Sequence, residues 1–257
     1  MLIPRLHDAL EQHLQPNKVL VIYGPRQVGK TTLLTRFLER FEGKFKLLTG
    51  DNIRVQSLFS GPDFESILSL SEGYTLIAID EAQRIPNVGL GLKILVDHVP
   101  GIFVIATGSS SFDLSGKIGE PLTGRKNILT LFPIAQLELR KLYNTYELKE
   151  KLPEFLIFGS YPEVVTSDSR RKKIARLEEI AESYLLKDIL SLDRVKSPKI
   201  LLDLLKLLAF QIGSEVSLNE LGRQLGIDTK TVGRYLDIFE KAFVIYNVRG
   251  FSRNLRK

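Results

Sequence analysis

The stretch that decides the fold is GPRQVGKT, which occupies residues 24–31. It matches the phosphate-binding loop pattern G-x-x-x-x-G-K-[ST] at every fixed position. The apolar, β-branched run Lys18–Tyr23 precedes it and predicts a buried strand of a parallel sheet. Residues 32–38 follow it and carry leucine and phenylalanine at helical spacing. Strand, glycine-rich loop and helix are the context in which this pattern binds phosphate.

The chemistry of the loop follows from its residue types. Gly24 and Gly29 permit backbone angles that other residues avoid, so successive N–H groups can turn toward one anion. The next helix directs its free N–H groups and the positive end of its dipole at the same point. We expect Lys30 to contact the β- and γ-phosphates and the Thr31 hydroxyl to bind Mg²⁺. The predicted contacts to a nucleotide are Gly24, Pro25, Arg26, Gln27, Val28, Gly29, Lys30, Thr31 and Thr32. The alternative is an ordinary strand–turn–helix with a chance lysine, and the context argues against it.

The composition limits the class of protein. The chain has 257 residues, of which 44% are hydrophobic and 26% charged, enough for one large or two smaller globular domains. It contains no cysteine, which excludes disulfides, a thiolate nucleophile and a cysteine-ligated metal. The net charge of +6 permits nucleic-acid binding without establishing it. No signal peptide and no apolar run of membrane-spanning length is visible, so we expect a cytoplasmic protein without a membrane partner.

A second motif ends another predicted strand. Residues 74–81 form an apolar run that terminates in Asp80-Glu81. The carboxylates at the end of such a strand emerge at the edge where open parallel sheets bind ligands. We expect Asp80 to hold Mg²⁺ and Glu81 to orient or deprotonate an attacking water molecule. The alternative is an acidic strand end that caps a helix; it is as good for this motif alone, and the phosphate-binding loop favours the functional interpretation.

Further core elements follow from the apolar pattern. The predicted strands are residues 45–49, 101–107 and 127–132, and the predicted helices are residues 3–14, 63–70 and 88–98. Ser109 and Ser110 follow the fourth predicted strand, where a hydroxyl could contact the γ-phosphate or position water. A solvated turn is an equally good interpretation of these serines.

The chain is predominantly helical after Pro133. The pattern predicts helices at residues 134–143, 152–158 and 171–190, the last with a stripe of core residues formed by Ile174, Leu177, Ile180 and Tyr184. Three further helices follow, beginning at Pro198, after Ser217 and after Asp228, and then a strand at residues 243–248. This order is typical of a winged helix-turn-helix. We therefore expect three parts: residues 1–133, 134–195 and 196–257.

Several stretches together resemble a prokaryotic branch of the AAA-type ATPases. They lie at residues 24–33, 49–51, 80–83, 107–110, 124–125, 158–163 and 184–188. The resemblance implies an α/β P-loop core with an additional strand in a parallel sheet flanked by helices, a helical lid, a winged helix, and ATP with Mg²⁺ as ligands. It also implies a C-terminal domain, nuclease-like in many members, before which this chain stops at Lys257. No arginine in the predicted lid matches the second sensor of such ATPases, which puts the coupling of lid and nucleotide in doubt.

Two residue sets are tied to partners. The resemblance places Arg125, beside the fifth strand, where it acts on the γ-phosphate of a neighbouring subunit in a homo-oligomer; a surface arginine in a salt bridge is an equal alternative. Thr229, Lys230 and Thr231 lie at the N-terminal end of the predicted recognition helix, and Lys230 and Arg234 lie on its outer face; these four residues would contact double-stranded DNA. The alternative is that this domain is a lid or a protein-docking surface.

The leading hypothesis is a Mg²⁺-dependent ATPase that hydrolyses ATP to ADP and phosphate and uses the cycle to switch conformation or assembly. The alternative is a nucleotide-gated regulator with little turnover that binds DNA or another protein. A helicase needs a second nucleotidase domain, for which the lid and winged helix leave no room. A GTPase is disfavoured because no Asn-Lys-x-Asp motif is present.

Overall fold

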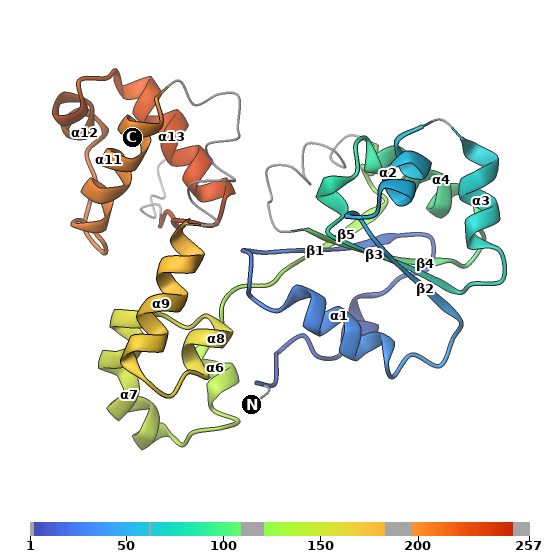
Figure 1. Ribbon diagram of the computed structural model, residues 1–257, viewed down its shortest axis with the longest axis horizontal. Coiled ribbons are helices and arrows are strands. Elements are labelled where there is room, and N and C mark those ends of the chain that lie inside the picture. The colour runs from blue at the N-terminus through green and yellow to red at the C-terminus, as the bar shows by residue number, and fades with distance from the viewer. Residues whose placement is uncertain (1–2, 62, 109–120, 183–196, 249–257) are drawn as a thin grey trace, which may run out of the picture. The chain divides into compact units, whose positions relative to one another are not determined.

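Five parallel strands form the centre of the first part of the chain (Figure 1). The computed structural model describes residues 3–61, 63–108, 121–182 and 197–248, and the chain divides into two units, Met1–Ile180 and Ala181–Lys257. The strands are β1 (Val19–Tyr23), β2 (Phe45–Thr49), β3 (Leu76–Asp80), β4 (Phe103–Gly108) and β5 (Lys126–Thr130). Their order is β2-β3-β4-β1-β5, so that β4 lies between β1 and β3 as the additional strand implied by the resemblance. This arrangement confirms the predicted α/β fold of a P-loop nucleotidase.

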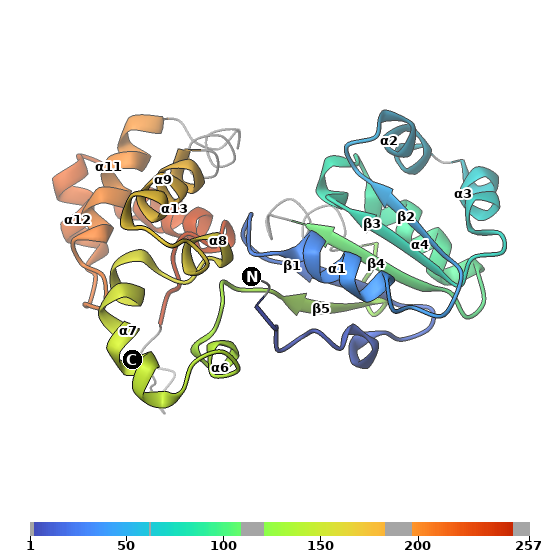
Figure 2. The ribbon, with the colours of Figure 1, turned by 60° about the horizontal axis from the view of Figure 1, so that its bottom comes forward.

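The helices of the core cover both faces of this sheet. Figure 1 shows α1 (Lys30–Leu38) on one face, with α2 (Ile53–Ser60), α3 (Phe64–Ser71) and α4 (Val88–His98) on the other. Figure 2 shows the twisted sheet with α1 lying across it and with β2 and β5 at opposite edges. The leucine and phenylalanine side chains of α1 are buried against β1, β3 and β5, as their spacing predicts. The sheet thereby fixes the start of α1 next to the carboxyl end of β1.

Two predictions for the core need correction. Helix α2 was not predicted; it begins after Asn52, whose side chain accepts a hydrogen bond from the Arg54 backbone N–H. The predicted helix at residues 3–14 is wrong, because only the 3₁₀ turn η1 (Leu10–His13) forms there. The backbone N–H of Leu6 instead donates to the carboxylate of Glu138, 132 residues away. This long-range contact holds the segment in an irregular path.

Short helices follow the sheet within the first unit. They are α6 (Gln136–Leu139), α7 (Thr145–Phe158), α8 (Pro162–Val165) and α9 (Arg170–Ile180). Helix α7 begins earlier than predicted because Asn144 and Glu147 form a capping box, with hydrogen bonds of 2.9 and 2.7 Å.

The predicted core stripe on α9 is wrong for the residues that the structure describes. Ile174 is exposed, Leu177 and Ile180 are half-buried, and Tyr184 lies outside the described residues. The buried side chain of α9 is Lys173, which forms an ion pair of 2.6 Å with Glu154 of α7. The face of α9 that packs is therefore the one that carries this lysine.

The second unit contains α11 (Pro198–Ala209), α12 (Leu218–Leu225) and α13 (Thr229–Lys241) around one apolar core. Ser217 and Asp228 cap α12 and α13, as predicted. The predicted strand at residues 243–248 is wrong: Phe243 has a φ of +60°, and the Val244 N–H donates to the Phe239 carbonyl at 2.8 Å. These residues end α13 and do not extend into a strand. Residues 197–248 thus contain the helices of the predicted winged helix without that strand.

Candidate active site

The loop after β1 has a backbone path that depends on glycine. Gly24 has a φ of +154°, and a Cβ there would lie 2.1 Å from the Leu131 carbonyl oxygen, so no other residue fits without a shift. Gln27 and Gly29 also have positive φ angles, of +59° and +92°. Gly29 is the N-cap residue of α1, so the loop leads directly into the N-terminus of that helix.

Lys30 lies buried inside the loop, with only 5% of its surface exposed. Its Nζ donates hydrogen bonds to the carbonyl oxygens of Gly24 and Pro25, at 2.9 and 2.6 Å. Burial lowers the pKa of Lys30 to about 8, against the opposing effect of the Glu81 and Asp80 carboxylates. The ammonium group is thus held within the loop beside both acidic residues of the second motif.

Asp80, the last residue of β3, is held by two hydroxyl groups. Thr31 Oγ1 of α1 donates to Asp80 Oδ2 at 2.8 Å, and Thr107 Oγ1 of β4 donates to Asp80 Oδ1. The structure therefore brings together the two predicted Mg²⁺ ligands, Thr31 and Asp80. Thr107 had no predicted role, although its position near the end of β4, the strand next to β3, was a usable signal.

Glu81 follows in an unusual backbone conformation with a φ of +52°. Its backbone N–H donates to Thr107 Oγ1 at 3.1 Å, and its Oε2 accepts a hydrogen bond of 2.5 Å from Gln83 Nε2. Gly50, which follows β2, packs closely against the Glu81 backbone: a Cβ on residue 50 would lie 2.2 Å from the Glu81 carbonyl oxygen. Gln83 and Gly50 thus fix the position of Glu81, and neither was predicted to belong to the site.

A cavity of about 170 Å³ adjoins the loop at Val28 and Gly29. Its walls come from the N-terminal segment, the loop with α1, and the segment around α8, and include Ile3, Arg5, Val28, Leu33, Ile134 and Pro162. These walls lie far apart in the sequence, so no local pattern could predict the cavity. The lining mixes these apolar side chains with charged and hydroxyl groups, among them Asp8, Arg36 and Glu163. A cavity of this mixed character beside a phosphate-binding loop is suited to a flat group and a polar group attached to the phosphates.

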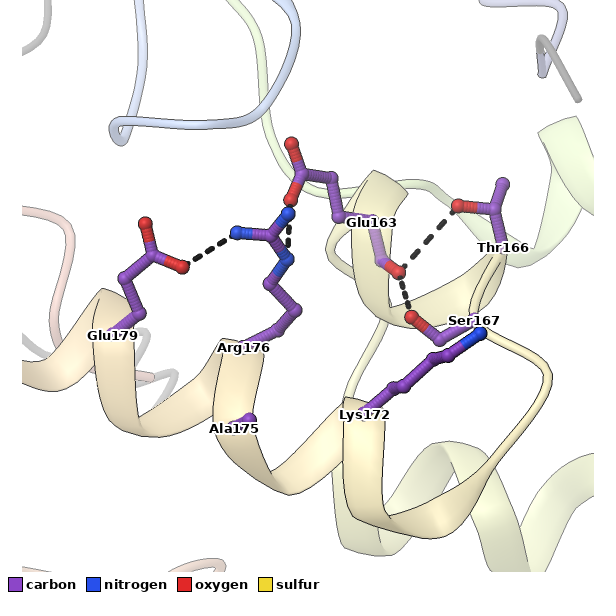
Figure 3. A pocket seen from close by; sticks show the side chains of 7 residues that line it. All are labelled: Glu163, Thr166, Ser167, Lys172, Ala175, Arg176 and Glu179. Carbon is purple, nitrogen blue, oxygen red and sulfur yellow. Dashed lines mark hydrogen bonds and ion pairs between the residues drawn. The ribbon is translucent and has the colours of Figure 1, made fainter.

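A larger cavity, of about 420 Å³, lies between α8 and α9 (Figure 3). Its charged groups are paired: Arg176 contacts Glu163 at 2.9 Å and Glu179 at 2.5 Å, and Lys172 contacts Asp168 at 3.4 Å. We do not assign it to the candidate active site, because these paired charges leave little net charge to attract an ionic ligand.

Two predicted site residues lie away from this cluster. Ser109 is outside the described residues. Arg125 precedes β5, so it lies at the amino edge of the sheet, opposite the edge that carries the loop, and its Nε donates to Asp97 at 2.5 Å. The structure does not bring Arg125 to the loop of its own chain, and its action on a neighbouring subunit stays a prediction.

The predicted DNA-contacting residues lie on α13 in the second unit. Thr229, Lys230 and Arg234 are exposed, as the predicted outer face requires. Thr231 instead binds the cap, because its backbone N–H and its hydroxyl both donate to the Asp228 carboxylate. DNA contact by this helix stays a prediction.

Comparisons with known proteins agree with this geometry. Residues 16–140 match the model of a family described as an AAA domain, and residues 149–257 match a domain of unknown function. An uncharacterized protein of Methanocaldococcus jannaschii is 27% identical over 95% of this chain, and one of Mycobacterium tuberculosis is 30% identical over 100% of it. The chain spans 59% and 56% of the length of these two relatives.

A Walker-type ATPase of Pyrococcus abyssi has a similar solved structure, with a TM-score of 0.61 and 18% identity over 94% of this chain and 90% of that one. At this identity the likeness shows the fold alone. That fold agrees with the match of residues 16–140 to an AAA domain. None of the helices in the described ranges has the length and hydropathy that crossing a bilayer requires.

Proposed function

We propose that this chain binds ATP with Mg²⁺ and hydrolyses it to ADP and phosphate. The observation that carries the proposal is the 2.8 Å contact between Thr31 and Asp80, which lies beside the buried ammonium of Lys30. This contact joins the loop to the end of β3 at the point where a nucleotide phosphate would lie. Neither motif alone defines such a site.

The residues fit a Mg²⁺ ion in their chemistry. Mg²⁺ prefers oxygen ligands and is usually bound by one or two protein groups, with substrate phosphates and water completing its shell. Thr31 and Asp80 supply a hydroxyl and a carboxylate. The described residues contain no group of three or more histidine, cysteine or acidic residues that could hold a metal ion without such phosphate and water ligands. When bound, the ion would neutralise charge on the phosphates.

Each residue of the site has a distinct role in this proposal. Lys30 exchanges the carbonyls of Gly24 and Pro25 for phosphate oxygens, because an anion satisfies an ammonium group better than a neutral carbonyl. Thr31 and Asp80 hold the metal ion. Gln83 orients the Glu81 carboxylate through Oε2, so that Oε1 is the atom that would accept the proton of the attacking water.

The cavity beside the loop would take the base and sugar of the nucleotide. Leu33, Ile134 and Pro162 supply apolar walls on which a flat base can lie. The same lining carries polar groups such as Thr32 and Arg36, and nothing in it selects adenine over another base.

The second unit would connect this cycle to a partner. Lys230 and Arg234 are exposed on α13 and could contact the phosphates of double-stranded DNA in a sequence-tolerant manner. The second candidate function, a nucleotide-gated DNA- or protein-binding regulator with little turnover, rests on the same exposed charges. We further propose a cytoplasmic protein in which Arg125 of one subunit completes the site of the next in a homo-oligomer.

The direct test is calorimetric titration of MgATP into the wild type and into Lys30→Ala. The proposal expects the variant to fold and to bind at least tenfold more weakly, about 1.4 kcal/mol, because a charged partner of the phosphates is lost. Lys149→Ala removes an exposed lysine of α7 and should bind as the wild type does. Equal affinities of wild type and Lys30→Ala would refute the proposed site.

A further inference from the structure

A buried ion pair connects the phosphate-binding loop to the segments on either side of it. Arg5 and Glu138 are 8% and 2% exposed, and Arg5 Nε contacts Glu138 Oε1 at 2.9 Å. Arg5 lies in the irregular N-terminal segment and Glu138 in α6, so 133 residues separate the partners. Neither residue belongs to the two sequence motifs, although Arg5 lines the cavity beside the loop.

The guanidinium of Arg5 binds three parts of the chain at once. Besides Glu138, it donates through Nη1 to the carbonyl oxygen of Val28 at 2.7 Å and through Nη2 to that of Phe132 at 2.5 Å. Val28 is a residue of the phosphate-binding loop, and Phe132 follows β5. Only arginine has a rigid, planar set of donors that can serve three acceptors in this way.

Glu138 is also fully engaged. Its Oε1 accepts from the backbone N–H of Leu6 at 2.7 Å as well as from Arg5, and its Oε2 accepts from the backbone N–H of Ala135 at 2.8 Å. A buried ion pair contributes little net stability compared with apolar residues of the same size. A role in positioning therefore explains this pair better than a role in stability does.

The contact with Val28 has a geometric consequence for the loop. In a trans peptide the carbonyl and the N–H of the next residue point in opposite directions, and no described peptide is cis. When Arg5 holds the Val28 carbonyl on the outside of the loop, the Gly29 N–H must point to the inside, toward the position of a phosphate. Gly29 has a φ of +92° and no Cβ, so this peptide has alternative orientations that the contact excludes.

We propose that Arg5 is a positioning residue that fixes the Val28–Gly29 peptide for phosphate binding, and that Glu138 locks Arg5 in place. Because Glu138 belongs to α6, the pair also couples the loop to the helices that follow β5. This link runs through the N-terminal segment and requires no arginine in those helices. The inference rests on the proposed function, since it concerns the same phosphate-binding loop.

The test is calorimetry of MgATP and of magnesium pyrophosphate with the wild type, Arg5→Gln, Arg5→Lys and Lys173→Gln. Arg5→Gln should bind both ligands about tenfold more weakly, about 1.4 kcal/mol, because the loop loses its charged hydrogen bond. Arg5→Lys should lie between it and the wild type, since lysine keeps the charge but not the three-way fork. Lys173→Gln is the matched control: it removes another buried cation paired with one carboxylate, and it should bind as the wild type does.

The two ligands separate a positioning role from a merely structural one. Circular dichroism shows whether Arg5→Gln is folded. Weaker binding of pyrophosphate by the folded variant supports the proposal, because pyrophosphate has no base or sugar. Wild-type affinity for pyrophosphate in folded Arg5→Gln refutes it, even if MgATP binds more weakly. If Arg5→Gln does not fold, Arg5→Lys decides by the same criterion. A wild type that binds neither ligand overturns the proposed function as well.

Discussion

Replacement of Gly50 by alanine should separate nucleotide binding from hydrolysis. An alanine Cβ at this position would lie 2.2 Å from the Glu81 carbonyl oxygen, whereas ordinary van der Waals contact begins at 3.4 Å. The backbones of Gly50 and Glu81 must therefore move apart by about 1.2 Å, and a displacement of about 1 Å at a catalytic group costs about 100-fold in rate. The close approach is to Glu81, and Gly50 contacts Asp80 only through a backbone hydrogen bond of 2.8 Å that alanine keeps. The loss of MgATP affinity should therefore be much smaller than the loss of turnover.

The assay combines phosphate release at saturating MgATP with calorimetry on the same preparations. Gly50→Ala should also lower the free energy of unfolding by about 1–3 kcal/mol, the usual cost of overpacking. Gly61→Ala is the matched control: it follows α2, and its Cβ would meet no atom closer than 3.8 Å, so turnover should not change. Wild-type turnover in Gly50→Ala, or a loss of affinity as large as the loss of turnover, would refute the proposed role of Glu81.

Three further predictions concern Lys30, α13 and Arg125. Burial lowers the pKa of Lys30 to about 8, and bound phosphate should raise it again, so MgATP affinity should fall above pH 8 and binding there should take up a proton. Calorimetry in buffers of different ionisation enthalpy measures both effects. An affinity that does not change up to pH 9.5 would contradict this prediction. The Lys230→Ala, Arg234→Ala double variant should bind duplex DNA more weakly at low salt; if it binds as the wild type does, or if neither binds, α13 is not a DNA-binding helix. Turnover per subunit should rise with protein concentration in the wild type and stay low in Arg125→Ala; flat turnover by a protein that remains monomeric with nucleotide would exclude a role in a neighbouring site.

The parts of the site that lie close together in sequence were predictable. The loop and Lys30 form one contiguous motif, and Asp80 and Glu81 end one apolar strand, so their positions follow from strand and helix patterns alone. Parallel strands place their carboxyl ends on one edge, which is why Thr31 and Asp80 meet although 49 residues separate them.

The rest depended on contacts between distant segments. Arg5 and Glu138 find each other only in the folded chain, and Gly50 gains its importance from the close approach of Glu81. The segment 243–248 has the composition of a strand, but the backbone of Phe243 turns and ends α13. The same apolar run therefore forms the end of a helix and not a strand. Tertiary contacts likewise held residues 3–9 out of the predicted helix.

The central claim, that this site hydrolyses ATP, is tested most directly by Glu81→Gln. Phosphate release and MgATP affinity should be measured side by side for the variant and the wild type. Glutamine keeps the shape of glutamate but cannot accept a proton from water, so binding should persist while turnover falls about 100-fold or more. Turnover at the wild-type rate in Glu81→Gln, or no MgATP turnover by the wild-type protein, would contradict the account.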